Sequence, residues 1–351
     1  MVVNKRAQID STVSYLHYRL TVIILFFSSL LLVFQYWLHK PISCMQVQEM
    51  PIQLLDTICW THSTYTTTTV IPNVVLGAQT PNVVPEERVY QWYYKWMCWA
   101  LLVQTVFFYG PHFVWKRFEN GLTEKLSEGL TDPFVEASKK RQKMNQLSEF
   151  LHQCRLRPAV IGVMPLIYVG CQQANLVNIL LQLFFMDRFL NKQFFSYGYY
   201  VMFFRTWGSS FLNVSDSLSK VFPTLAKCSY TRLGPSGLPQ NISTQCVLPL
   251  NSFAEWIYLF LWFWLHGLLL ITFLSLVFSF CRLFSKKLQM FSILHYCSLL
   301  SVEDVSSVVQ NGKLTDWFVL YQLSKNVNVL HFYDLIIGLK KDKLSQPNTM
   351  L

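Results

Sequence analysis

The stretch Trp256–Cys281, WIYLFLWFWLHGLLLITFLSLVFSFC, decides the fold class, because it runs for 26 residues without a charged side chain. A helix needs about 17–20 apolar residues to cross the hydrocarbon core of a bilayer. Three other charge-free runs are long enough, namely Leu20–Leu38, Met97–Trp115 and Ala159–Met186. The four runs predict an all-α membrane protein with four transmembrane helices.

The composition agrees with a membrane protein. Hydrophobic residues make up 52% of the chain and charged residues 14%, and the mean hydropathy is +0.30. A soluble chain usually carries about a quarter charged residues. The first apolar run is too long for the core of a signal peptide and lacks a small-residue cleavage site after it, so we expect it to remain as a membrane helix.

Basic residues predict the orientation. Segment 116–158 holds nine Lys and Arg residues and the tail 282–351 holds eight, whereas loop 39–94 holds only Lys40 and Arg88. Positive residues favour the cytosolic side, so both termini and the middle loop are expected in the cytosol. The predicted order is cytosolic 1–19, helix 20–38, outer loop 39–94, helix 95–115, cytosolic loop 116–158, helix 159–186, outer loop 187–255, helix 256–281 and a helical cytosolic region 282–351.

The net charge of +10 is interpreted as attraction to anionic membrane lipid. The basic run Lys139–Lys143 also resembles a nucleic-acid patch, but its place between two spans argues against a nucleic-acid partner. The sequence contains no zincin, nucleophile-elbow, phosphate-loop or dinucleotide-binding motif and no C-x-x-C pair. We therefore predict no enzyme activity, no catalytic residue, no metal and no cofactor.

Each outer loop holds two cysteines, Cys44 and Cys59 in the first, Cys228 and Cys246 in the second. Outside the cell such pairs form disulfides, and the residues leave all three connectivities open. The second loop also carries two potential glycosylation sites, at Asn213 and Asn241.

Polar side chains recur every seven residues along the first span, at Ser14, Thr21, Ser28 and Gln35. Two helical turns separate neighbouring members, so they form one slowly drifting stripe. Such a stripe fits either the wall of a water-filled pore or packing between helices. In the second span, Pro111 removes a backbone hydrogen bond and is expected to kink the helix.

Several segments in order along the chain resemble the innexins, the invertebrate gap-junction family, especially insect members. They include LHYRLTVIIL at Leu16–Leu25, CWTHSTYT at Cys59–Thr66 and DWFVLYQL at Asp316–Leu323. The family signature Tyr-Tyr-Gln-Trp-Val appears here as Tyr93, Tyr94, Lys95, Trp96 and Met97. This departure concerns gating and partner compatibility more than the fold. A virus-carried copy, called a vinnexin, is an alternative that the sequence leaves open.

The resemblance implies a ring of eight subunits in the plasma membrane, alone or with other innexins. Two rings on apposed cells would dock at a gap junction and pass ions and small molecules. The alternatives are an undocked hemichannel and a non-conducting subunit that modifies host innexin channels. The resemblance further implies disulfides Cys44–Cys246 and Cys59–Cys228, a pore lined by the polar stripe, and Met1–Asp10 folded into the pore mouth.

Overall fold

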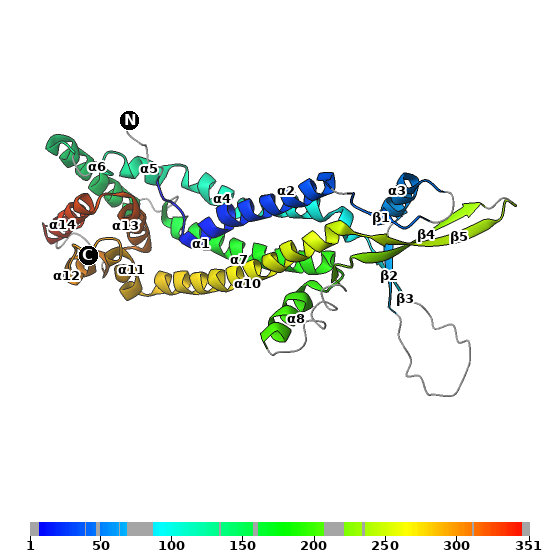
Figure 1. The fold of residues 1–351 in the computed structure, drawn as a ribbon. Coiled ribbons are helices and arrows are strands. Elements are labelled where there is room, and N and C mark those ends of the chain that lie inside the picture. Colours follow the sequence, from blue (N-terminus) through cyan, green and yellow to red (C-terminus); the bar gives the residue numbers. More distant parts are fainter. Residues whose placement is uncertain are drawn as a thin grey trace. The chain divides into compact units, whose positions relative to one another are not determined.

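A computed structural model (Figure 1) describes residues 7–38, 40–46, 50–62, 64–68, 87–132, 135–156, 161–206, 221–233, 236–310 and 312–345. The chain divides into two compact units, and each is described by itself. One comprises residues 1–20, 107–178 and 268–351, and the other comprises residues 21–106 and 179–267. Each of the four long helical spans contributes residues to both units.

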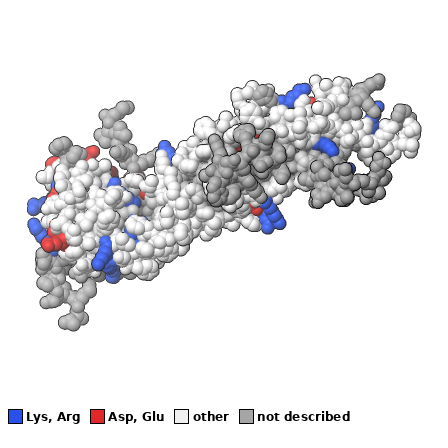
Figure 2. All heavy atoms as spheres, turned by 60° about the horizontal axis from the view of Figure 1, so that its bottom comes forward, with Lys and Arg blue, Asp and Glu red and all other residues white. Residues whose placement is uncertain are grey.

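Four helical spans are long and apolar enough to cross a membrane. The first, Thr12–Leu38, consists of α1 (Thr12–Tyr15), the π-helical segment η1 (Leu16–Thr21) and α2 (Val22–Leu38); the others are α4 (Met97–Glu119), α7 (Met164–Phe189) and α10 (Pro249–Phe284). This confirms the predicted helical class. Charged side chains are sparse over the long helices on the face drawn in Figure 2, as expected for helices surrounded by lipid.

The helices differ from the apolar runs at their ends. Helix α10 begins at Pro249, before the charge-free run, because proline is well suited to a first helical position. Helix α4 begins at Met97, after the short 3-10 helix η2 (Tyr93–Lys95). It continues without interruption through Pro111, and the kink there stays a prediction.

The first unit is helical. Besides parts of the long helices it contains α5 (Leu122–Ser127), α6 (Ala137–Leu156), η3 (Ile161–Val163), α11 (Lys286–Leu294), α12 (Val302–Gln310), α13 (Leu314–Asn326) and α14 (Val329–Ser345). Helix α13 is the centre of this unit, since all residues from Thr315 to Ser324 are buried. A helix buried on every side must be surrounded by other helices, and α13 contacts α5, α6, α11 and α14.

The second unit contains a five-stranded antiparallel sheet of order β1-β5-β4-β2-β3. Its strands are β1 (Ser43–Cys44), β2 (Thr64–Thr68), β3 (Glu87–Gln91), β4 (Leu225–Leu233) and β5 (Pro239–Val247), and the unit also holds α3 (Ile52–His62) and α8 (Phe194–Thr206). The prediction of two outer loops in an all-α protein did not include these strands. A signal was present, because Ala226, Cys228 and Tyr230 alternate with polar residues at the period of a half-buried strand.

Candidate docking site and channel-forming helices

Two disulfides join the two loops that the strands come from. Cys44 of β1 is bonded to Cys246 of β5, and Cys59 of α3 is bonded to Cys228 of β4. The bonds bridge 202 and 169 residues of sequence, so they fasten segments that local structure does not hold together. This is the pairing that the family resemblance implied.

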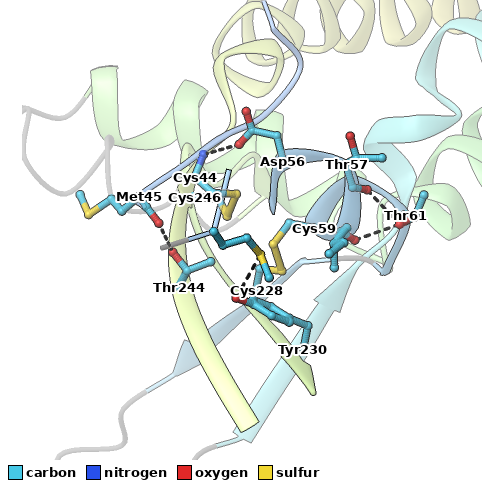
Figure 3. The surroundings of a disulfide bond; sticks show 12 residues. Cys44, Met45, Asp56, Thr57, Cys59, Thr61, Cys228, Tyr230, Thr244 and Cys246 are labelled. Carbon is cyan, nitrogen blue, oxygen red and sulfur yellow. Dashed lines mark hydrogen bonds between the residues drawn. A yellow bond between two sulfur atoms is a disulfide. The ribbon is translucent and has the colours of Figure 1, made fainter. Parts of the chain in front are cut away.

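The disulfides form the centre of a small apolar core (Figure 3). Three of the four cysteines are completely buried and Cys44 is 6% exposed. Around them pack Ile42, Leu55, Ala226 and Leu248, with Met50, Trp60 and Tyr230 partly buried at the edge. Three of the four sulfur atoms, those of Cys44, Cys59 and Cys246, lie within 4.8 Å of one another. Because every one of these sulfurs is already consumed in a disulfide, the group has no thiolate to offer a metal ion.

Hydrogen bonds fix the chain around this core. The backbone N–H of Cys44 donates to the Asp56 carboxylate at 2.9 Å, and the Thr244 hydroxyl donates to the carbonyl of Met45 at 2.7 Å (Figure 3). The first contact ties β1 to α3, and the second ties the segment after β1 to β5. Disulfides and hydrogen bonds together therefore join four elements at this core, namely β1, α3, β4 and β5.

Strands β4 and β5 form a long hairpin, paired from Leu225 with Val247 to Leu233 with Pro239. Side chains alternate between its two faces. The face with Ala226, Cys228 and Cys246 is buried, whereas Thr231 and Asn241 lie opposite each other on the exposed face. The Thr231 hydroxyl donates to the Asn241 side-chain oxygen at 2.8 Å.

The end of the hairpin is exposed and partly apolar. Leu233 is 70% exposed and Leu238 is 66% exposed. Gly237 has a φ of 73°, a left-handed conformation that glycine adopts without strain, and it lies at the turn between the strands. Exposed apolar side chains that lie together are one feature of a surface that contacts another protein.

The signature residues join the loops to α4. Tyr93 is 2% exposed, its hydroxyl donates to the carbonyl of Val221, and its ring contacts those of Phe189 and Phe222. Tyr93 thus connects the start of α4 with α7 and with the segment that precedes β4. Met97 is completely buried, while Trp96 is 55% exposed.

The next two signature residues hold α3. The Tyr94 ring packs against Trp60 with centroids 5.1 Å apart, and burial raises the pKa of the Tyr94 phenol, so it stays neutral at physiological pH. Lys95, which replaces the usual glutamine of the family, donates from Nζ to the carbonyl of Thr61 at 3.0 Å. A lysine satisfies the carbonyl at the C-terminal end of α3, where a positive charge is favourable.

The polar stripe of the first span divides into two kinds of position. Thr21 is completely buried and accepts a hydrogen bond from Trp264 Nε1 at 3.0 Å, and Ser28 is 7% exposed. Both therefore lie among helices of their own subunit, as the helix-packing interpretation predicts. Ser14 and Gln35 are partly exposed, and for them contact with the pore stays a prediction.

The amino-terminal segment is held by its neighbours in the first unit. The side-chain amide of Asn326 accepts from the backbone N–H of Gln8 at 2.6 Å and donates to the carbonyl of Gln8 at 3.1 Å. Trp115 Nε1 donates to the carbonyl of Ile9 at 3.3 Å, and Asp10 lies 3.3 Å from His112. Residues 8–10 are thus fixed against α4 and α13, a set of contacts that the sequence did not indicate. Met1–Arg6 lie outside the described residues.

The π-helical segment η1 is a feature that sequence reasoning missed. It contains His17, which is completely buried and lies 2.7 Å from the hydroxyl of Thr272 on α10. His17 is thus packed between helices of the first unit. A π-helical turn closes its hydrogen bonds over five residues, one more than an α-helical turn. Nothing in the sequence indicated this wider turn, because such turns depend on tertiary packing.

Four helices long and apolar enough to cross a membrane, with two disulfides between the intervening loops, define a multi-pass membrane protein. The profile of the innexin family matches residues 10–342. The chain therefore belongs to the innexin family, whose members are subunits of oligomeric gap-junction channels and are not enzymes.

Individual relatives agree over nearly the whole chain. The sequence is 34% identical over 347 residues to "Innexin inx2" of Schistocerca americana, covering 95% of this chain and 93% of the relative. It is 33% identical over 344 residues to "Innexin inx2" of Drosophila melanogaster, covering 95% and 91%. It is 30% identical over 335 residues to "Innexin shaking-B" of the same fly, covering 93% and 88%.

Proposed function

We propose that this chain assembles with further copies into a ring around a pore, and that two such rings on apposed cells dock to form a continuous passage for ions and small molecules. The disulfide core between α3, β1 and the β4–β5 hairpin is the observation that carries this proposal. Docking orders the contacting loops, and ordering a flexible loop reduces the affinity of any association. Loops that are cross-linked beforehand have little freedom left to lose.

The proposed orientation puts these loops outside the cell and both termini in the cytosol. Support comes from the basic residues of segments 116–158 and 282–351, which favour the cytosolic side. Support also comes from the disulfides, which persist in an oxidising compartment. A ring of eight, as the family resemblance implies, is proposed as the assembly, and other innexins are candidates for mixed rings.

The test is dye transfer and junctional conductance between paired cells that express only this protein. If docked channels form, dye transfer and junctional conductance should both increase with the amount of this protein at the contact between the two cells. Dye uptake by single cells without transfer between pairs would favour the hemichannel alternative. The third outcome is no dye transfer and no conductance with this protein alone, together with weaker coupling by another innexin when the two are expressed together. That outcome would favour the non-conducting subunit.

Cysteine substitution tests which part of the polar stripe meets the pore. Gln35→Cys and Ser14→Cys are expected to react with a charged, water-soluble thiol reagent, and the reaction should lower the conductance of an open channel. Thr21→Cys and Ser28→Cys should react at least about tenfold more slowly, because their side chains are packed between helices. The reaction rate is measured from the fall in conductance after the reagent is added. Equal reaction rates at all four positions would contradict the division of the stripe into exposed and packed residues.

Glycosylation of Asn241 would oppose docking. The side chain lies on the exposed face of the hairpin, where a branched glycan would stand between two rings. If the site is used, Asn241→Gln is expected to increase coupling between cells and to reduce the mobility shift produced by a glycosidase. The matched control is Thr231→Val, which removes the hydrogen bond to Asn241 and leaves the glycosylation motif intact. A glycan on Asn241 together with full coupling would contradict the docking block.

The second potential glycosylation site, Asn213, lies outside the described residues.

A further inference from the structure

Helix α8 is unusual for a segment of an extracellular loop. Residues Phe194–Phe204 contain no charged side chain, and seven of these eleven are aromatic. The chain reaches α8 through a tight reversal after α7, in which Asn191 and Lys192 both have a positive φ. The Asp187 carboxylate accepts from the backbone N–H of Phe195 at 3.3 Å and so caps the start of the helix.

Helix α8 packs closely on α10 within the second unit. A Cβ atom added to Gly198 would lie 2.0 Å from the ring of Trp262, so only glycine allows the two helices to approach this far. The Phe195 ring lies 6.1 Å from the ring of His266, and the Tyr197 hydroxyl donates to the carbonyl of Glu255 at 2.8 Å. The contacts cover α10 from Glu255 to His266.

The depth of these contacts follows from the length of the charge-free run. About 20 residues of α10 cross the hydrocarbon core, and the run Trp256–Cys281 contains 26. Every window of 20 residues within this run includes both Trp262 and His266. The first turns of α8 therefore pack against α10 at a level where α10 itself is in the membrane.

Both faces of α8 are largely apolar, with Ser196 as an exposed polar residue. Phe194, Tyr197 and Val201 are buried, whereas Phe195, Tyr199 and Met202 are 44%, 57% and 50% exposed. The exposed residues follow the spacing i, i+4, i+7 and form one stripe along the helix. A water-facing helix would carry polar residues on this stripe.

We propose that α8 is embedded in the lipid leaflet on the side of the disulfide-linked loops, with the Phe195–Tyr199–Met202 stripe in contact with phospholipid chains. Helix α10 carries an exposed apolar stripe of its own, in which Trp256, Phe260 and Phe263 have the same spacing. Phe263 directly follows Trp262 along α10, so its side chain points about 100° around the helix from the residue that α8 covers. Tyrosine and tryptophan are also the residues that favour the boundary between lipid and water.

The full-length native protein in phosphatidylcholine bilayers tests the proposal. One sample contains a phosphatidylcholine with a photoactivatable diazirine on an acyl chain, and a second contains a water-soluble diazirine. Trypsin cleaves after Lys192 and Arg205, so α8 is released as the single peptide 193–205, and the start of β4 is released as the control peptide 221–227. Mass spectrometry then measures how strongly each peptide is labelled by each reagent.

The ratio of lipid labelling to aqueous labelling is expected to be at least about tenfold higher for peptide 193–205 than for peptide 221–227, because a membrane-embedded aromatic helix is withdrawn from water. Equal ratios for the two peptides would place α8 in water and overturn the proposal. Weak labelling of 193–205 by both reagents in the ring, with strong lipid labelling only after dissociation into subunits, would assign the stripe to a neighbouring subunit and also overturn it.

Discussion

Replacing Cys59 by Ser is expected to reduce junctional coupling to background. The substitution removes the bond to Cys228 and leaves a free thiol in a core where both sulfurs are completely buried. Loss of a disulfide in a small extracellular region destabilises the folded state by roughly 2–5 kcal/mol. Here the loss falls on α3 and the hairpin, whose mutual position is set by this bond, whereas the transmembrane helices pack through other residues. Rings should therefore still reach the cell surface.

The measurement is conductance between paired cells, normalised to surface protein determined by biotinylation. Cys281→Ser is the matched control, because Cys281 is a free, exposed cysteine and its replacement should leave coupling unchanged. The double variant Cys59→Ser/Cys228→Ser should resemble either single variant, since both partners of one bond are then lost together. Undiminished coupling in Cys59→Ser would refute the idea that the disulfide core shapes the docking site.

Replacing Tyr93 by Ala is expected to prevent stable assembly altogether. Truncating a large buried aromatic side chain destabilises a folded protein by about 3–5 kcal/mol, through lost burial and the cavity left behind. Tyr93 also connects three segments, because its ring contacts Phe189 and Phe222 and its hydroxyl donates to Val221. The variant should be retained inside the cell, and its detergent-solubilised form should lose the ring peak in size-exclusion chromatography.

Two further variants separate the contribution of the Tyr93 ring from that of its hydroxyl and from that of the neighbouring signature residue Trp96. Tyr93→Phe keeps the ring and loses one hydrogen bond, which corresponds to about 1 kcal/mol, so assembly should survive with a lowered Tm. Trp96→Ala removes a larger ring from the same signature, but this ring is 55% exposed, and the subunit fold should be little affected. If Tyr93→Ala and Trp96→Ala had equal effects on assembly, the anchoring role of Tyr93 would be wrong.

The positions of the cysteines could be predicted from the sequence, whereas the surroundings of the polar stripe could not. The four disulfide-forming cysteines were identified from their positions between apolar runs, and burial of all four in one core agrees with that. The polar stripe was ambiguous from the start, because small polar side chains suit water and helix interfaces alike. Only the position of Trp264 beside Thr21 shows that this residue is packed against α10. Gln8 and Asn326 are 318 residues apart in the sequence. No pattern in the sequence near either residue predicts their contact.

The sequence by itself determined the four apolar helices, the family and the sorting of cysteines into two loops. Each of these depends on a property that a short stretch carries alone, since the transfer of a 20-residue apolar run into lipid is favourable whatever surrounds it. Only the tertiary structure decided the order of the strands and the place of α8 against Trp262 and His266, and it confirmed the disulfide partners that the family resemblance implied. These depend on which distant segments meet. Sheet pairing and disulfide bonding across 169 and 202 residues are selected by the packing of the whole chain, because the stability of a strand depends on the cross-strand and same-face neighbours that it meets.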